Sequence, residues 1–559
     1  MKKVQKKTLQ ALLLEANIMT PKVLQDLANE QEKTGKGLEE ILILKGIVTE
    51  VDLLRILSEQ LNVPYVDLLQ CAIDLSSATK IPEPIARRHR AIAIGAEKDK
   101  LRVAMTEPLN IYALDDIRIS TKMEILPVLA SGRAIDELIN QVYISAQTKH
   151  IVFQVEKELQ EEKQETRVAE REMGEDSSKV QLVNNLLERC ILDGASDLHI
   201  EPFERVVCVR YRVDGQLREV INVSKETLSA ITSHIKVVSG LDIAERRLPQ
   251  DGRMSKIVKG QKVDLRISIL PTIYGEKTVI RFIYRTDKKR ELSEIGFFPE
   301  DYIKVENLLK NPHGIILLTG PTGSGKSTTL AATLRRLNKE SLNIVTVEDP
   351  VENMLEGINQ VAVNHKIGLT FAAVLRAILR QDPDIIMIGE MRDAETSSIA
   401  IRAAITGHLV LSTLHTNDAA SSIPRLIDMG TEAYMVGAAV KGVISQRLVR
   451  KLCPLCCKKH VVTASEAAFY KVPQGIEVYE AGGCVSCHQT GYKGRSAVHE
   501  VLVMDNQLQE MIASGKTTAE ELKEVAKQKG MRTLWENAYY NVRQGTTTLE
   551  EMLRITYEQ

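Results

Sequence analysis

The stretch GPTGSGKST, residues 320–328, constrains the fold more than any other part of this chain. It contains the pattern Gly-x-x-x-x-Gly-Lys-Ser, preceded by the apolar run GIILLT and followed by the helix-forming run STTLAATLRRL. A buried strand that enters a glycine-rich loop and continues as a helix binds phosphates, because the loop amides and the positive end of the helix face the anion. The sequence therefore predicts a nucleotide-binding α/β domain.

Lys326 is expected to reach the β- and γ-phosphates of this nucleotide, and Ser327 is expected to bind magnesium. The predicted nucleotide contacts are Gly320, Pro321, Thr322, Gly323, Ser324, Gly325, Lys326, Ser327 and Thr328.

Acidic residues follow two further apolar runs. LNIVTVEDPVE places Glu348 at the end of one predicted strand, and DPDIIMIGEMRD places Glu390 at the end of another. Carboxyl ends of parallel strands meet at one edge of a sheet, so both acids are expected beside the phosphate loop. Hydrolysis needs a carboxylate near the magnesium and one that positions or deprotonates the attacking water. Glu390 is the predicted magnesium partner, and either acid remains a candidate general base.

A third predicted strand, in TGHLVLSTLHT, is bracketed by His408 and His415. As hydrogen-bond donors, both histidines are candidates for contact with the γ-phosphate. The alternative is that they are structural.

Four of the eight cysteines form two Cys-x-x-Cys pairs. The predicted ligands are Cys453, Cys456, Cys484 and Cys487. Four thiolates make the tetrahedral set that zinc takes in structural sites, with no position open for a substrate. We therefore predict structural zinc; the alternative is four unrelated cysteines. Cys457, His460 and His488 are expected beside this site and not as ligands.

Length and composition limit the number of domains and the kinds of partner that the chain can have. A chain of 559 residues is expected to hold about three to five domains. A net charge of -1 gives no overall attraction to nucleic acid. No apolar run approaches the ~18 residues that span a bilayer, so we expect a cytoplasmic protein that reaches a membrane through partners.

The combination of these motifs resembles one family. GPTGSGKSTTL, VEDPVE, RQDPDIIMIGEMRD and TGHLVLSTLHTNDAASSIPRL look like the Walker A, Asp, Walker B and His boxes of the ATPases of type II secretion and type IV pilus assembly. The resemblance implies an ATP hydrolase with ATP, Mg²⁺ and Zn²⁺, working as a homohexamer on an inner-membrane platform protein. The four cysteines are similar to those of the family's assembly and secretion ATPases, whereas pilus-retraction ATPases generally lack them, which favours assembly over retraction.

The same resemblance implies roles for four arginines. They are Arg266, Arg281, Arg376 and Arg380. In the family, arginines at these places hold nucleotide phosphates, some across domain or subunit boundaries. Surface salt bridging is the alternative.

The implied fold class is α/β, with a RecA-like motor core preceded by a PAS-like α/β domain. An N-terminal helical and α+β regulatory domain and a helical C-terminal domain with a zinc knuckle complete it. The predicted boundaries are 1–150 for the N-terminal domain (helical repeat 9–60, α/β segment 61–145), 151–179 for a charged linker, 180–289 for the PAS-like domain, 293–448 for the core and 449–559 for the C-terminal domain.

The N-terminal repeat resembles domains that in some family members bind cyclic di-GMP through an R-L-G-x-x-L motif. Here Thr8 and Gly37 replace the arginine, and Gln10 and Glu39 replace the glycine. Because the guanidinium is missing from both copies, we predict that this domain docks protein partners and does not bind the dinucleotide.

Two other functions remain open at this point. The motor boxes do not separate pilus assembly, including a variant for DNA uptake, from type II secretion. A nucleotide-gated scaffold without productive hydrolysis is the alternative from another class.

Overall fold

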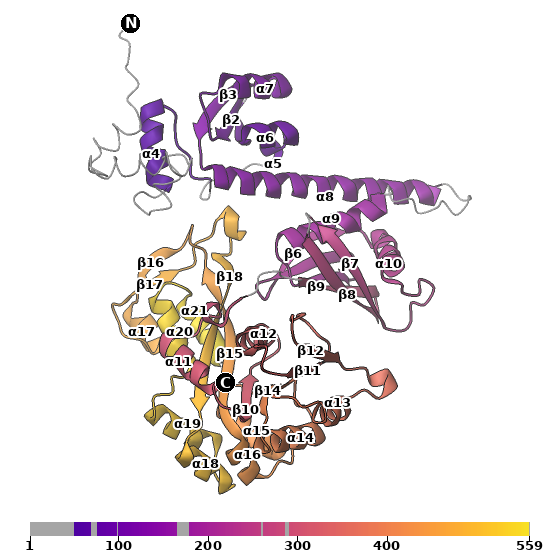
Figure 1. The fold of residues 1–559 in the computed structure, drawn as a ribbon. Helices are drawn as coiled ribbons and strands as arrows, with labels where there is room; N and C mark the ends of the chain where they lie inside the picture. Colours follow the sequence, from indigo (N-terminus) through magenta and orange to yellow (C-terminus); the bar gives the residue numbers. More distant parts are fainter. Residues whose placement is uncertain are drawn as a thin grey trace.

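The computed structural model describes residues 50–68, 75–97, 99–164, 178–258, 261–284 and 290–557. Figure 1 shows the N-terminal domain uppermost, the PAS-like domain below it, and the core with the C-terminal region at the bottom. The predicted repeat lies outside the described residues except for α4 (Glu50–Leu61). In the described part of the chain, no helix is long and apolar enough to cross a membrane.

The N-terminal domain is built on a three-stranded sheet of order β1-β2-β3. β1 (Ala91–Glu97) pairs antiparallel with β2 (Lys100–Met105), and β3 (Glu124–Leu129) runs parallel to β2. The parallel pair is joined by α7 (Ile111–Thr121), which begins where the Asn110 side chain accepts the Ala113 amide. Two short helices, α5 (Leu75–Ala78) and α6 (Glu83–His89), complete an α+β domain, as predicted.

A single helix, α8 (Gly132–Gln164), connects this domain to the next one. Leu138 and Val142 pack in the N-terminal core, whereas Ile151, Val152 and Val155 pack in the core of the PAS-like domain. The helix therefore runs through the predicted boundary at residue 150, because an apolar stripe precedes the charged run. The exact domain boundaries stay predictions.

The PAS-like domain contains an antiparallel six-stranded sheet of order β6-β5-β4-β9-β8-β7. Helices α9 (Ser178–Leu192) and α10 (Lys225–Ser239) pack on one face, over buried residues such as Leu265 and Ile267. The strands are β4 (Asp197–Pro202), β5 (Val207–Val213), β6 (Gln216–Val223), β7 (Gln250–Val258), β8 (Gln261–Thr272) and β9 (Gly275–Tyr284). The opposite face of the sheet carries polar residues, because successive side chains on a strand alternate between faces.

The core is a seven-stranded sheet of order β12-β11-β13-β14-β10-β15-β18, parallel except for the last pair. The interior strand β10, between β14 and β15, is buried throughout: Ile315 and Leu317 enter one hydrophobic cluster, and Ile316 and Leu318 enter another. Helices therefore cover both faces, as a doubly covered parallel sheet requires.

The strands of this sheet are β10 (Gly314–Thr319), β11 (Ile344–Glu348), β12 (Asn359–Ala362), β13 (Ile385–Ile388), β14 (Leu409–Leu414), β15 (Val440–Leu452) and β18 (Tyr492–Val503). The helices of the core are η1 (Leu292–Glu294), α11 (Pro299–Leu308), α12 (Lys326–Leu337), η2 (His365–Ile367), α13 (Phe371–Ile378), α14 (Ala394–Ile405), α15 (Ser422–Asp428) and α16 (Ala433–Ala439).

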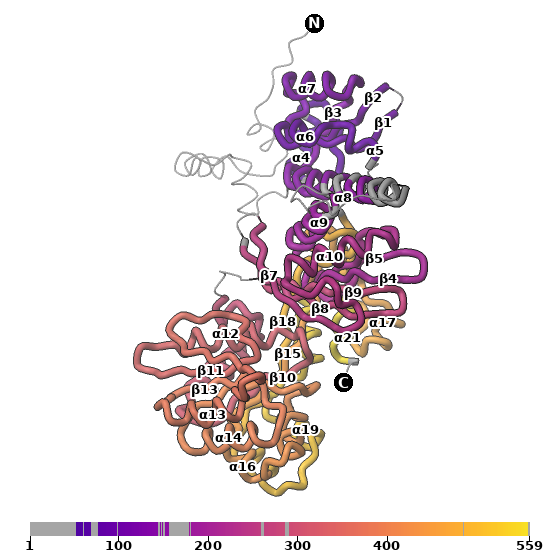
Figure 2. The backbone as a smooth tube through the Cα atoms, turned by 90° about the vertical axis from the view of Figure 1, so that its right-hand side faces the viewer, coloured from indigo at the N-terminus to yellow at the C-terminus, as the bar shows by residue number. Residues whose placement is uncertain are grey.

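The C-terminal region completes the core sheet, since β18 pairs with β15 across the predicted boundary at 448. Figure 2 shows these two strands running together along the molecule. Between them the chain forms β16 (Lys458–Val461), α17 (Ala464–Tyr470), β17 (Glu477–Glu480) and η3 (Val485–Cys487). The last helices are α18 (Asn506–Ala513), α19 (Ala519–Gln528), α20 (Leu534–Arg543) and α21 (Leu549–Tyr557), which confirms the helical C-terminal domain.

Candidate nucleotide site and metal centre

The phosphate loop joins β10 to α12, as the motif predicts. Gly325 has φ 90° and is the residue before the first turn of α12. A Cβ on Gly325 would lie 2.8 Å from the Gln446 Nε2, and one on Gly320 would lie 2.4 Å from the Gln446 carbonyl oxygen. Both glycines are therefore required by backbone conformation and by the strand beneath the loop.

Gln446, on β15, braces this loop from below. Its Nε2 donates to the Ser324 carbonyl oxygen at 2.8 Å, and its Oε1 accepts from the Thr329 hydroxyl at 2.7 Å. The side chain is buried, so these bonds have no competition from water. Gln446 thus fixes the loop relative to the start of α12.

The Lys326 ammonium group turns back onto its own loop. It donates to the carbonyl oxygens of Gly320 at 2.6 Å and Pro321 at 3.1 Å. Burial lowers the pKa of Lys326 to about 8; the field of Arg447 acts in the same direction and that of Glu390 opposes it. The Ser324 Oγ is buried and has no hydrogen-bond partner among the described residues. A bound phosphate would supply partners for both side chains.

Glu390 and His415 lie together at the carboxyl edge of the sheet. Glu390 follows β13, and its carboxylate lies 2.7 Å from Arg392 Nη2 and 3.6 Å from His415 Nε2. Burial and the nearby Lys326 and Arg392 charges lower the pKa of His415, so the ring is largely neutral at pH 7. Lys326, Glu390 and His415 therefore act on one another electrostatically, around the place where a γ-phosphate would sit.

Glu348 ends β11, which pairs directly with β13. One of its carboxylate oxygens accepts from the Thr346 hydroxyl at 2.7 Å and from Gln360 Nε2 at 2.9 Å. These bonds hold the carboxylate at the same edge as Glu390. Glu348 and Glu390 both stay candidates for the general base.

His408 lies at the other end of its strand. Its carbonyl oxygen accepts the Gly314 amide, and its ring Nδ1 lies 3.0 Å from the Ala403 carbonyl oxygen. Gly314 begins β10, whereas the phosphate loop follows its end, about 17–20 Å away at the usual rise per residue. The structure therefore does not bring His408 together with the phosphate loop of the same chain.

Two of the four arginines lie on the PAS-like domain. Arg266 is the cross-strand partner of both Arg253 and Arg281, so three arginines cross β7, β8 and β9 in one row. Arg281 pairs with Asp197 at 2.9 Å. Like charges placed opposite one another destabilise a sheet, so the row suits an anion. The sequence analysis did not single out Arg253, because only the strand register places it beside Arg266.

The other two arginines belong to the core, on α13 and directly after it. Arg376 on α13 pairs with Glu395 at the start of α14, and Arg380 Nη1 donates to the Arg376 carbonyl oxygen at 2.6 Å. Both side chains are exposed. In this chain they have protein partners and not the phosphate loop.

A cleft of about 1280 Å³ separates the PAS-like domain from the core. Arg253 and Arg266 line one wall, and Arg335, Lys339 and the loop 350–357 line the other. The cleft places the arginine row opposite the loop that follows Glu348.

The four predicted metal ligands come together at one point, with all sulfur atoms within 4.8 Å of one another. The distances are 3.8 Å for Cys453–Cys484, 3.7 Å for Cys456–Cys487 and 3.6 Å for Cys484–Cys487. Tetrahedral zinc with bonds of about 2.3 Å would hold its sulfur ligands roughly 3.8 Å apart. The donor set and its spacing therefore fit zinc.

The neighbouring candidates are engaged elsewhere. His460 contacts Glu466 at 2.9 Å and Glu480 at 3.4 Å. His488 instead faces the N-terminal and PAS-like domains. Its Nδ1 lies 3.2 Å from Gln141 Nε2 on α8, and its Nε2 lies 3.9 Å from Asp193. Next to it, the Gly494 amide donates to Asp214 of the PAS-like domain at 2.9 Å. The knuckle thus contacts both domains that precede the core.

Comparison with known proteins identifies the family of the chain. The profile of type II/IV secretion system proteins matches residues 172–554, and that of the MshEN domain matches residues 61–149. The Legionella pneumophila ATPase DotB, a solved structure, has a TM-score of 0.51 and 23% identity, over 68% of this chain and 96% of its own. That likeness concerns the fold.

Three curated relatives align over nearly the whole chain. The type IV pilus assembly ATPase PilB of Thermus thermophilus is 43% identical over 95% of this chain, which spans 60% of that relative's length. PilB of Myxococcus xanthus is 40% identical over 98% of both chains. Type II secretion system protein E of Xanthomonas campestris is 38% identical over 94% of both. The chain belongs to the type II/IV secretion system protein family.

Proposed function

We propose that the chain is the ATPase motor of type IV pilus assembly, working as a homohexamer on an inner-membrane platform protein. The observation that carries this proposal is the gathering of Lys326, Glu390 and His415 at the carboxyl edge of the core sheet. A match that covers 98% of both chains is to a pilus assembly ATPase.

The chemistry follows from the residues present. Lys326 exchanges its loop carbonyls for the β- and γ-phosphate oxygens. Ser327 and Glu390 would hold Mg²⁺, which neutralises phosphate charge when bound. Glu390 or Glu348 orients or deprotonates the attacking water, and the neutral His415 donates toward the γ-phosphate. Arg376 and Arg380 act on a neighbouring subunit's nucleotide in this proposal, since both are exposed.

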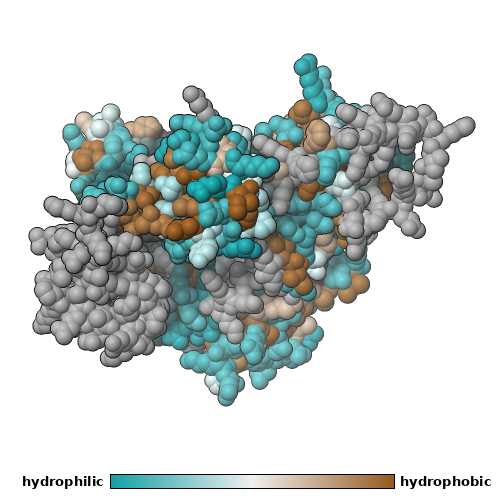
Figure 3. Space-filling view, turned by 90° about the horizontal axis from the view of Figure 1, so that it is seen from above, coloured by the Kyte–Doolittle hydropathy of each residue, from teal (hydrophilic) through white to brown (hydrophobic). Residues whose placement is uncertain are grey.

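The N-terminal domain serves as the docking part. Its exposed apolar side chains include Leu109, Ile111 and Ile119. Figure 3 looks onto the molecule from that side and shows apolar side chains gathered among hydrophilic ones. Docking through protein partners would hold the motor at the cytoplasmic face of the inner membrane; cyclic di-GMP binding is not expected.

Type II secretion is the second candidate, favoured by the full-length match to a secretion ATPase at 38% identity. Replacing Glu390 with Gln at the native locus separates the two, with surface filaments imaged by electron microscopy and secreted proteins profiled by mass spectrometry. Loss of filaments with normal secretion supports pilus assembly, and intact filaments with a depleted secretome support type II secretion.

A matched control is Glu477→Gln, an exposed glutamate of the knuckle that pairs with Lys459. It should leave both readouts unchanged. If Glu390→Gln also changes neither, the motor function itself is contradicted. A purified wild-type protein that binds ATP without turnover would instead favour the nucleotide-gated scaffold.

A further inference from the structure

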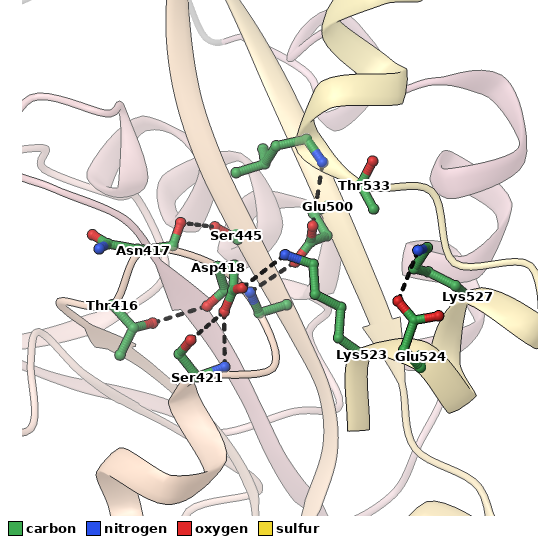
Figure 4. Close-up of polar contacts among 12 residues, drawn as sticks. Thr416, Asn417, Asp418, Ser421, Ser445, Glu500, Lys523, Glu524, Lys527 and Thr533 are labelled. Atoms are coloured by element: carbon green, nitrogen blue, oxygen red, sulfur yellow. Dashed lines mark hydrogen bonds and ion pairs between the residues drawn. The ribbon is translucent and has the colours of Figure 1, made fainter. Parts of the chain in front are cut away.

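The loop that carries His415 is held from the C-terminal region. His415 directly follows β14, and Thr416, Asn417 and Asp418 lead on toward α15. The Asn417 carbonyl oxygen accepts from Arg447 Nη2 at 2.7 Å and from the Ser445 hydroxyl at 3.4 Å, both on β15. In Figure 4 this loop lies on one side of the strands, and the helix that carries Lys523 lies on the other side.

Asp418 is the point at which the loop meets those helices. One carboxylate oxygen accepts the Ser421 amide at 2.8 Å, and the other accepts from Lys523 Nζ of α19 at 3.0 Å (Figure 4). The Asp418 and Lys523 side chains are only 14% and 23% exposed. A pair this far from water is weakly screened, so its loss is costly.

Glu500 of β18 adds a second buried carboxylate. It accepts the Ala419 amide at 2.9 Å and the Leu534 amide at 3.2 Å, so it ties the same loop to the start of α20. Lys523 lies within the field of Asp418 and Glu500 alike. One lysine therefore lies beside two carboxylates that shape this loop: the half-buried Asp418, which accepts the Ser421 amide, and the buried Glu500, which accepts the Ala419 amide.

We propose that Lys523 is a positioning residue for His415, acting through Asp418; this rests on the proposed role of His415 at the γ-phosphate. Without the ammonium group, the Asp418 carboxylate would lose its ion-pair partner on α19 and the loop would shift. Displacing a group in an active site by about 1 Å can cost roughly 10²-fold in rate.

The test is Lys523→Met in the full-length protein. We expect kcat for ATP to fall about tenfold, with KM and the nucleotide Kd within about twofold of wild type. Binding should persist because Gln446, which does not touch Lys523, braces the phosphate loop. Lys523→Arg should restore most of kcat, since the charge remains.

Lys527→Met is the matched control. It lies one turn along the same helix and pairs with Glu524 at 2.8 Å, as Figure 4 shows. It should behave as wild type. A Lys523→Met protein with unchanged kcat, or with kcat and nucleotide affinity lost together, would overturn the proposal. If Lys523→Met does not fold, the double variant Asp418→Asn/Lys523→Met removes both charges of the pair and should fold with the same low kcat.

Hydrogen exchange provides a readout that needs no turnover. In Lys523→Met, the amides of residues 415–421 should exchange faster, while those of residues 320–328 stay unchanged. Unchanged exchange at residues 415–421 contradicts the positioning role. A wild-type protein without ATP hydrolysis contradicts only the proposed function, so the two failures are distinguishable.

Discussion

The nucleotide site and the cysteine cluster differ in how complete each one is within a single chain. Four sulfur atoms from two short turns already have the spacing of a tetrahedral zinc site. At the nucleotide site, Lys326 bonds to loop carbonyls, Glu390 pairs with Arg392, and Arg266 lies on another domain. A structural site is closed by its own ligands, whereas a catalytic site keeps groups that must exchange partners in each cycle.

The largest expected effect is on ATP turnover, and it also tests whether the nucleotide site and the cysteine cluster are independent of each other. Lys326→Ala should lower ATP turnover by roughly 10²–10³-fold, because it removes a cation from the transferred phosphoryl group. Zinc content should stay at wild-type level. Phosphate release and metal analysis of the same preparation measure both. Lys310→Ala, at the end of α11, is the control; full turnover in Lys326→Ala would refute the assigned role.

Removing one sulfur ligand should change the metal content and the stability of the protein but leave the nucleotide site intact. Cys484→Ser should release zinc and lower the unfolding midpoint by roughly 5–10 °C, with ATP affinity within about twofold. Proteolysis near α8 should also become faster, since the knuckle contacts Gln141 and Asp214. Cys457→Ser is the control that keeps the metal, because Cys457 is outside the four-sulfur cluster. Wild-type protein without zinc would contradict the metal assignment.

Replacing either of the two histidines of the His box should affect ATP turnover to a different extent. His415→Ala should lower kcat by about tenfold or more, because the ring lies 3.6 Å from Glu390. His408→Ala should stay within about twofold, since its ring contacts the Ala403 carbonyl oxygen at the far end of β14. Steady-state ATPase assays decide this; equal losses in the two variants would count against the placement.

The smallest effect is a dependence on pH. Burial lowers the pKa of Lys326 from 10.5 to about 8, so the free folded protein binds fewer protons than the unfolded chain between those values. The contribution of Lys326 to the free energy of unfolding of the nucleotide-free protein should therefore rise with pH between about 8 and 10.5. Nucleotide binding favours the charged lysine, so affinity should fall above pH 8, by at most about tenfold per pH unit.

Calorimetry and nucleotide titration at several pH values measure these two trends. Lys326→Met should abolish both of them. A wild-type affinity that is flat from pH 7 to pH 9.5 would show that Lys326 keeps its charge in the free protein.

Motifs with short spacing are the part of the site that the sequence could indicate. Residues 320–328 and the two Cys-x-x-Cys pairs were found from sequence because each acts within one turn of chain, where local geometry decides what the side chains reach. The charged segment after residue 150 was interpreted as a solvated helix or flexible linker, and the packing of Ile151, Val152 and Val155 in the PAS-like core was not predicted. His408 and His415 were both candidates for the γ-phosphate, but they bracket the strand, so only His415 lies at its carboxyl end.

Residues that act across long separations left no signal in the sequence. Gln446 and Lys523 belong to none of the quoted motifs, and Asp418 lies within the His box without a role of its own there. Each meets its partner only after the core sheet forms. Arg253 joins Arg266 only through the register of β7 and β8. Such contacts depend on strand order and packing, which a single sequence does not list.

The sequence by itself determined the chemistry available: a phosphate loop, acids after two strands and four thiolates. These depend on residue type and near neighbours, whose geometry is set by backbone sterics and hydrogen bonding. Only the tertiary structure decided which of these groups meet. Placing Glu390 and His415 beside Lys326, sending His408 to the opposite edge and pairing Asp418 with Lys523 require a parallel sheet of fixed order, held by burial of apolar residues on both faces.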